Sequence, residues 1–141
     1  MYPVDASASK RMKSIRRKGT APELAVREAF SNLGLRYRLN VRSLPGSPDL
    51  ASQRLCLAVF VHGCFWHRHH GCNRATTPKR NAAFWAEKFL RNVARDRRNY
   101  RTLEQRGYRV LVLWECETES TNFKQQLTRA LRRMKCLPQG Q

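Results

Sequence analysis

The spacing of hydrophobic residues predicts three helices. Val26, Phe30 and Leu33 follow one another at intervals of 4 and 3 residues, which predicts an amphipathic helix. Thr20 precedes this helix as a candidate N-cap, and Gly34 follows it as a stop signal. A long helix from about 81 to 105 is predicted by the apolar stripe Trp85, Phe89, Val93, Tyr100 and Leu103, and a last helix by Phe123, Leu127, Leu131 and Met134.

Four stretches between these helices predict strands. A first strand is expected within residues 37–41. Residues 50–52 and 55–61 are expected to pair across a turn near Gln53, and the second stretch lacks polar alternation, as a central strand covered on both faces does. Residues 108–114 predict another buried strand. This order of elements predicts a single α/β domain, in which a mixed central sheet is flanked by helices.

The composition indicates a folded protein with a strongly basic exterior. The 141 residues include 28 Lys and Arg against 10 Asp and Glu, a formal net charge of +18, while 41% are hydrophobic. That apolar fraction supports a core and excludes a disordered polybasic tail. No apolar run approaches the roughly 20 residues of a membrane span, and the first residues lack a signal-peptide stretch, so we expect a cytoplasmic protein. The expected partner is a polyanion, most commonly nucleic acid.

Residues 1–19 are expected to form a basic N-terminal arm ahead of a folded domain at 20–141. The second half of the arm holds six cations and little that could form a core. Such a segment can bind the phosphates of DNA through Lys10, Arg11 and Lys13. The alternative is a tail that only improves solubility.

Cysteine and histidine residues concentrate in the segment after the predicted central strand. Cys64, His69 and Cys72 form a compact set of ligands suited to tetrahedral zinc. A closed structural site needs a fourth ligand, and Cys116, just after the last predicted strand, is the best candidate. His70 is an alternative to His69, because it also lies close to Cys72. The alternative to a metal site is a set of packing cysteines and surface histidines.

The five cysteines are expected to be thiols or metal ligands rather than disulfides, because we expect a reducing compartment. Cys56 lies among Leu and Val residues and is expected to be a small core residue. Cys136, near the C-terminus, has no visible role.

Two histidines and one aspartate are candidates for catalysis. His62 ends the central strand and His67 lies in the candidate metal loop, so both imidazoles would be held in place. Two imidazoles beside a carboxylate can deprotonate a water and orient a phosphate. Asp49 supplies a carboxylate at the start of strand 50–52, where it could bind Mg²⁺; turn chemistry after Pro48 is the alternative.

Two further acidic residues could support the site. Asp96 interrupts the apolar stripe of the long helix, and a charge that points inward needs a partner. That partner would be a histidine of the site or an arginine in a core salt bridge. Glu23 lies three residues after Thr20, a spacing that a capping box explains fully.

Phe65 and Trp66 lie in the polar loop rather than on a helix or strand stripe. Aromatic side chains presented in this way on a basic protein suit stacking on bases or wedging between base pairs. Packing in the core is the alternative. Trp85 could join them, although its place in a helical stripe favours core packing.

Five short strings combine these residues: LPGSPD at 44–49, VFVHGCFWH at 59–67, FW at 84–85, NVARDRR at 92–98 and VLWEC at 112–116. Together they resemble the very-short-patch-repair (Vsr) DNA mismatch endonucleases. The resemblance extends from about residue 9 to residue 134, and HGCFWH is its most specific part. One departure is Val61, where the best-known members of the family have Thr.

The resemblance implies a fold of the PD-(D/E)xK nuclease type. The usual acidic-x-Lys positions are occupied here by Phe60, Val61 and His62, so that an imidazole replaces the lysine. The resemblance implies Mg²⁺ at Asp49 and at the backbone carbonyl of Val61, with His62 and His67 activating water or contacting phosphate. It also implies a structural zinc on Cys64, His69, Cys72 and Cys116.

The function that the resemblance implies is nicking of one DNA strand 5′ to the T of a T:G mismatch, the first step in repairing deaminated 5-methylcytosine. Phe65, Trp66 and Trp85 would wedge into the duplex, and the arm around Met12 would hold it from the other groove. The expected partner is double-stranded DNA with a T:G mismatch, bound by a monomer that associates with the nucleoid. Other repair proteins could be further partners.

Two alternative functions follow from the same residues. A zinc-stabilised DNA-binding module without catalysis would share the charge, the aromatic loop and the zinc. It would give no reason for Asp49, His62 and His67 to converge. A sequence-specific restriction or nicking nuclease on the same fold would be indifferent to mismatches.

Overall fold

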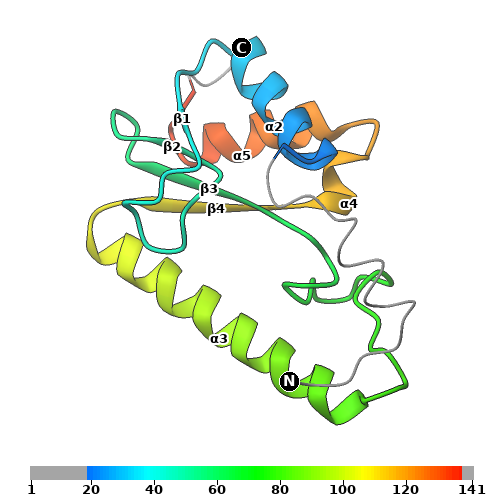
Figure 1. Cartoon of the computed structure of the whole chain (residues 1–141). Helices are drawn as coiled ribbons and strands as arrows, with labels where there is room; N and C mark the ends of the chain where they lie inside the picture. The colour runs from blue at the N-terminus through cyan, green and yellow to red at the C-terminus, as the bar shows by residue number, and fades with distance from the viewer. Residues whose placement is uncertain (1–18, 138–141) are drawn as a thin grey trace.

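The computed structural model describes residues 19–137, which form a four-stranded sheet between two layers of helices (Figure 1). The strands, in their order across the sheet, are β1 (Arg38–Leu39), β2 (Leu50–Ser52), β3 (Leu57–His62) and β4 (Arg109–Trp114). β1, β2 and β3 pair antiparallel, and β3 pairs parallel with β4. The mixed sheet flanked by helices is therefore confirmed. The predicted arm contacts Lys10, Arg11, Met12 and Lys13 lie outside the described residues.

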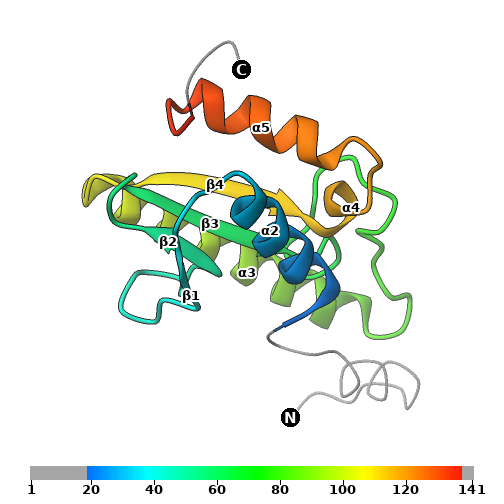
Figure 2. The same cartoon turned by 90° about the horizontal axis from the view of Figure 1, so that it is seen from above.

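Helices cover both faces of the sheet (Figure 2). α2 (Ala21–Asn32) and α5 (Phe123–Arg133) lie on one face, and α3 (Ala82–Gln105) lies on the other. α3 connects β3 to β4 and so allows their parallel pairing. The sequence did not predict α4 (Glu115–Thr118), a single turn directly after β4. None of the described helices has the length and apolar character that crossing a membrane requires.

Side chains alternate across β3, and this alternation assigns each residue to one helical layer. Leu57 and Val59 belong to the hydrophobic cluster that contains the inward residues of α2 and α5. Ala58 and Phe60 belong to the cluster on the opposite face, beneath α3. Because side chains of a strand repeat every two residues, His62 lies on the face of Phe60 and therefore faces α3.

The predicted start of α2 is confirmed in part. Thr20 is the N-cap, and its hydroxyl accepts a hydrogen bond from the Glu23 N–H. The Glu23 carboxylate accepts from the N–H of Gly19 rather than from that of Thr20, so the reciprocal contact reaches one residue further than a capping box. Glu23 is buried at the helix start, with an exposed fraction of 5%.

Two predicted strands differ in the structure. The first strand is β1, two residues long, because Asn40, which has a φ of 48°, interrupts the extended backbone. The last strand, β4, is mostly half-buried rather than buried, and only Leu113 is fully covered. β4 lies at one edge of the sheet, so it has a strand neighbour on one side only.

The prediction for Cys56 was wrong. Cys56 is exposed, with a φ of 50°, in the turn between β2 and β3, and β3 begins one residue later. The apolar run that suggested a core position therefore includes part of a turn. Cys136, for which the sequence gave no role, is buried in the cluster between the sheet and α5.

The packing of α5 on the sheet predicts an unequal effect of two leucine truncations. Leu127 is 1% exposed in the core, whereas Leu90 on α3 is 72% exposed. Leu127→Ala is expected to lower the free energy of unfolding by about 2–5 kcal/mol, the usual cost of a cavity at a buried leucine. Leu90→Ala is the control and is expected to change it by less than about 0.5 kcal/mol. Urea unfolding measures both, and equal effects would contradict the described core.

Candidate active site and metal centre

Asp49 lies directly before β2 and reaches the end of β3. Its Oδ2 accepts a hydrogen bond from the Val61 N–H at 2.7 Å. Burial, together with the negative charge of Glu23, raises the pKa of Asp49 from 3.8 to about 6, against the opposing effects of the Val61 N–H and of His67. Asp49 is thus a half-buried carboxylate held at the end of β3 and near His67, a position that turn chemistry after Pro48 does not explain.

His62 and His67 stack on each other. Their ring centroids are 3.7 Å apart and the ring planes differ by 8°. His62, the last residue of β3, is buried, whereas His67 lies in the following loop and is partly exposed. The structure therefore brings together the two imidazoles that the sequence singled out, and His67 lies close enough to Asp49 to act on the pKa of its carboxyl.

Asp96 of α3 pairs with His67, which is one of the two partners that the sequence left open. The Asp96 Oδ2 lies 2.6 Å from the His67 Nδ1. This contact directs the Nδ1–H of His67 toward the carboxylate and leaves Nε2 available for a ligand. An arginine partner in the core is not observed for Asp96 among the described ion pairs.

Tyr100, one helical turn after Asp96, hydrogen-bonds to His62 through its hydroxyl and the ring Nε2. Burial raises the pKa of the Tyr100 hydroxyl, so the group stays protonated at neutral pH. Burial and the neighbouring His67 lower the pKa of His62 to about 3, so the His62 ring is neutral at the same pH. Sequence reasoning placed Tyr100 in the apolar stripe and missed this contact.

The candidate metal ligands form one cluster. The ligand atoms of Cys64, His69, Cys72 and Cys116 all lie within 4.8 Å of one another. The His69 Nδ1 is 3.6 Å from the Cys64 Sγ and 3.3 Å from the Cys116 Sγ, close to the roughly 3.5–3.8 Å between ligands of a tetrahedral zinc. His69 rather than the exposed His70 belongs to the cluster.

The chemistry of the four side chains fits a divalent cation. Three thiols and one imidazole are the donor set of closed zinc sites. Burial raises the pKa of the Cys64 and Cys116 thiols, which means that their thiolate forms are costly. A bound cation would offset this cost, because it stabilises the thiolate form. Glu115 supports the cluster, since its Oε1 accepts from the Cys64 N–H at 3.1 Å. The sequence analysis did not identify Glu115, which directly precedes Cys116.

An aromatic cluster lies between the metal loop and the start of α3. Phe65 and Trp66 are half-buried and pack edge-to-face on each other. Beneath them, Trp85 and Phe89 of α3 are buried, with exposed fractions of 2% and 5%. Trp85 therefore packs in the core, as its place in the helical stripe favoured, whereas Phe65 and Trp66 retain exposed surface.

Arg68 anchors the loop that carries His67, although no sequence pattern pointed to it. Its guanidinium lies over the Phe89 ring, 3.9 Å from the centroid. It also donates to the backbone carbonyls of Phe65, Ala75 and Thr76 and to the Thr77 hydroxyl. These contacts join both ends of the metal loop to α3 independently of a metal.

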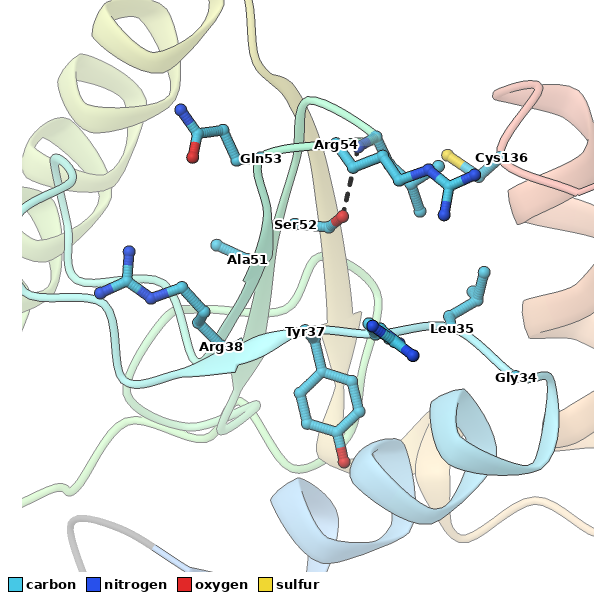
Figure 3. A pocket seen from close by; sticks show the side chains of 11 residues that line it. Gly34, Leu35, Tyr37, Arg38, Ala51, Ser52, Gln53, Arg54 and Cys136 are labelled. Carbon is cyan, nitrogen blue, oxygen red and sulfur yellow. Dashed lines mark hydrogen bonds between the residues drawn. The ribbon is translucent and has the colours of Figure 1, made fainter.

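A surface pocket at the opposite end of the sheet is separate from these groups (Figure 3). It lies beside β1 and the turn before β3, and Arg36, Arg38 and Arg54 line it together with Cys136. No carboxylate or imidazole is among its lining residues. Its charged lining residues are all arginines, and we do not assign it to catalysis.

Comparison with known proteins gives one consistent family. Residues 4–74 match the family described as DNA mismatch endonuclease Vsr. The Type II nicking enzyme V.XorIIP of Xanthomonas oryzae is 44% identical over 75% of this chain and 77% of its own length. The Type II nicking enzyme V.NmeAIP of Neisseria meningitidis is 40% identical over 88% of this chain and 89% of its own length. The DNA mismatch endonuclease Vsr of Escherichia coli is 41% identical over 79% of this chain and 70% of its own length.

The raised pKa of Asp49 predicts how a neutral substitution changes stability with pH. Because the folded state raises this pKa from 3.8 to about 6, the Asp49 charge destabilises the fold progressively as the pH rises between these two values, and fully above about 6. In buffer without magnesium at pH 7.5, Asp49→Asn is expected to raise the free energy of unfolding by on the order of 2–3 kcal/mol. The difference is expected to vanish near pH 4, where Asp49 is protonated in the folded state.

Urea unfolding at both pH values tests this prediction. Glu104→Gln, at an exposed position of α3, is the matched control and is expected to change stability little at either pH. A lower stability of Asp49→Asn than of the unmodified protein at pH 7.5 would contradict the predicted burial cost.

Proposed function

The chain belongs to the DNA mismatch endonuclease Vsr family, and from this premise we propose that it nicks one strand of a duplex 5′ to the T of a T:G mismatch. As a member of the family, it is a DNA endonuclease. A DNA-binding module without catalysis is thereby excluded. What we propose beyond this is the cleavage position, the mismatch preference and the roles of individual residues.

The observation that carries the proposal is the convergence of four polar side chains at the carboxyl end of β3. Asp49 is hydrogen-bonded to Val61, and His62 stacks on His67, which in turn pairs with Asp96. A carboxylate and two oriented imidazoles in one place can activate a water and contact a phosphate. The charge of +18 supports a polyanionic substrate.

The residues around Asp49 fit a magnesium ion. Mg²⁺ is commonly held by one or two carboxylates and substrate phosphates, with water completing its coordination. Asp49 uses one oxygen for the Val61 N–H and keeps the other, and we propose the Val61 backbone carbonyl as a second ligand. The raised pKa of Asp49 supports the same assignment, because a cation stabilises a carboxylate whose charge is costly to bury. When bound, Mg²⁺ stabilises the negative charge that develops on the phosphate and on the leaving 3′-oxygen.

The two imidazoles receive different roles in this mechanism. His67 takes the proton of the attacking water at its Nε2, because Asp96 holds its Nδ1–H and stabilises the cation that forms. His62 stays neutral, since burial lowers its pKa to about 3, and it contacts the phosphate. Two stacked rings at 3.7 Å also disfavour simultaneous protonation, because the like charges would repel each other.

We propose that zinc is the cation of the Cys64, His69, Cys72 and Cys116 cluster, and that its role is structural. Four protein ligands close the coordination shell and leave no open position for a substrate. The bound ion would fix the loop between Cys64 and Cys72, which contains His67, Phe65 and Trp66. The site would thus combine a rigid aromatic loop with a catalytic imidazole.

The exposed faces of Phe65 and Trp66 are proposed to wedge into the duplex beside the mismatch. The buried Trp85 supports Trp66 from below, with ring centroids 6.1 Å apart, rather than meeting a base in this conformation. A mispaired base costs less to unstack than a Watson–Crick pair, which gives preference for the mismatch. The basic arm, with Met12, is proposed to hold the duplex from the other groove.

The sheet and the position of Asp49 support a PD-(D/E)xK nuclease architecture in which His62 takes the place of the lysine. In β3 the sequence Phe60-Val61-His62 leaves no acidic side chain at the first of these positions. The Asp49 carboxylate, which accepts a hydrogen bond from the Val61 N–H, then supplies the acidic group at the end of β3. We therefore propose one Mg²⁺ with few protein ligands.

A sequence-specific nicking nuclease is the second candidate function. It is favoured by one observation, namely that relatives from Xanthomonas and Neisseria are named Type II nicking enzymes. The two candidates share the fold, the metals and the catalytic residues. They differ in whether a matched duplex of the same sequence is cut.

Nicking of two otherwise identical duplexes tests the proposed function. With Mg²⁺, the T:G duplex is expected to be nicked 5′ to the T at least roughly tenfold faster than the matched duplex, because unstacking the mispaired base is easier. Equal rates on both duplexes would favour the sequence-specific nuclease. No nicking of either duplex would contradict both candidates.

The same assay tests the role of Asp49. Asp49→Ala is expected to slow nicking by at least about 100-fold, since it removes a group that supports transition-state charge stabilisation. Glu104→Ala, at an exposed position of α3, is the matched control and is expected to nick at the unmodified rate. An Asp49→Ala variant that nicks at full rate would overturn the magnesium assignment.

Zinc content tests the metal cluster separately from nicking. The purified chain is expected to hold one zinc ion, and Cys72→Ser to bind it more than about 100-fold more weakly, because even a partner outside the ligand set contributes 10- to 100-fold. Cys56→Ser is the matched control, because Cys56 is exposed in a turn outside the cluster. Competition with a chelator measures both affinities. Unchanged zinc affinity in Cys72→Ser would contradict the assignment.

A further inference from the structure

α3 presents two polar groups to the stacked imidazoles, one turn apart. Asp96 contacts the His67 Nδ1, and Tyr100 contacts the His62 Nε2. Residues four apart lie on the same side of a helix, so a single helical face reaches both rings. The centroids of the two rings are 3.7 Å apart, so two residues one helical turn apart can each contact one ring. Asp96 is part of the proposed function, whereas Tyr100 has no role there.

We infer that Tyr100 is a positioning residue that holds His62 as the Nδ1–H tautomer, so that this N–H faces the phosphate of the DNA strand to be cut. The contact of this N–H with phosphate depends on the proposed function. The tautomer itself depends only on contacts within the folded chain.

The hydrogen-bond partners available to Tyr100 determine whether Tyr100 or His62 donates in their contact. A phenol has one hydrogen to donate, and a neutral imidazole has one nitrogen that donates and one that accepts. Among the described residues, the Tyr100 hydroxyl has a single hydrogen-bond partner, the His62 Nε2. If Nε2 carried the proton and donated to Tyr100, the phenol hydrogen would have no acceptor there. The satisfied arrangement is therefore Tyr100 O–H donating to an unprotonated Nε2, which puts the proton on Nδ1.

The surroundings of His62 allow little other adjustment. The ring is 5% exposed and is bounded by Phe60, Trp114 and the Tyr100 ring, with centroid distances of 5.5, 5.5 and 6.1 Å, in addition to the His67 ring. Tyr100 in turn packs against Phe60 at 5.2 Å. The surrounding aromatic rings fix the plane of the imidazole, and the hydroxyl of Tyr100 determines which nitrogen carries the proton.

With this tautomer, the two histidines have different roles. His62 Nδ1 has no hydrogen-bond partner among the described residues. As an N–H it is a donor, which suits a phosphate oxygen and does not suit the removal of a proton from water. His67, whose Nδ1 is occupied by Asp96, keeps Nε2 as the acceptor. One helix thus orients one imidazole as a donor and the other as a base.

The first test reads the tautomer directly and uses no DNA. In the zinc-loaded, histidine-¹⁵N-labelled protein at pH 7.5, a long-range ¹H–¹⁵N spectrum distinguishes protonated from unprotonated ring nitrogens. His62 is expected to carry its proton on Nδ1, and Tyr100→Phe is expected to shift it to Nε2 or to a mixture. His62 with its proton on Nε2 in the unmodified protein would overturn the inference, whatever the nicking activity is.

The second test measures single-turnover nicking and duplex affinity. Tyr100→Phe is expected to slow the nicking step by about 10- to 100-fold, the range for partners that orient a catalytic group. The affinity for the duplex is expected to change less than about twofold, because the Tyr100 hydroxyl points to His62. Tyr108→Phe is the matched control, because no described residue hydrogen-bonds its hydroxyl, and its rate is expected to be unchanged.

The two tests separate the inference from the proposed function. A rate for Tyr100→Phe within twofold of the unmodified rate would overturn the positioning role while leaving the mismatch endonuclease intact. If the protein nicked neither duplex, the proposed function would fail, and the spectrum would still decide the tautomer.

Discussion

Alternation of side chains along β3 is the constraint on which the site depends. It places Leu57 and Val59 in the core beneath α2 and α5, and Phe60 and His62 toward α3. A shift of the strand by one residue would exchange the two faces and remove His62 from α3. The burial of both faces of β3 therefore specifies the position of the His62 imidazole as well as the fold.

The site is built from charged and polar groups that are costly to bury. Burial raises the pKa of Asp49 and lowers that of His62, so each group is displaced toward its neutral form. Strongly shifted titratable groups that converge beside one strand end are typical of catalytic sites. Surrounding contacts hold these groups in place: Arg68 ties the loop to Phe89 of α3, Glu115 accepts from the Cys64 N–H, and the buried Trp85 supports the aromatic loop. The fold thus stabilises an arrangement that the polar groups alone would not favour.

Much of this architecture could be predicted from the sequence, because it follows from periodicity and ligand chemistry. Asp96 could be found because a charge in an apolar stripe requires a partner, and His67 supplies it. Tyr100 could not be found in the same way, since an aromatic residue fits the stripe whether or not its hydroxyl is used. Cys56 was misassigned because an apolar run does not reveal where a turn ends and a strand begins. The choice between His69 and His70 likewise needed the loop conformation.

A crystal structure with an uncleaved T:G duplex would show whether Asp49, His62 and His67 act on one metal-bridged phosphate, as we propose. Calcium in place of magnesium would keep the strand intact. We expect a cation held by Asp49 and the Val61 carbonyl on the phosphate 5′ to the mismatched T. We also expect the His62 Nδ1 within hydrogen-bond distance of that phosphate, about 2.7–3.2 Å, and the His67 Nε2 at the same distance from the attacking water. A cation bound away from Asp49, or a phosphate out of reach of both imidazoles, would contradict the proposed arrangement.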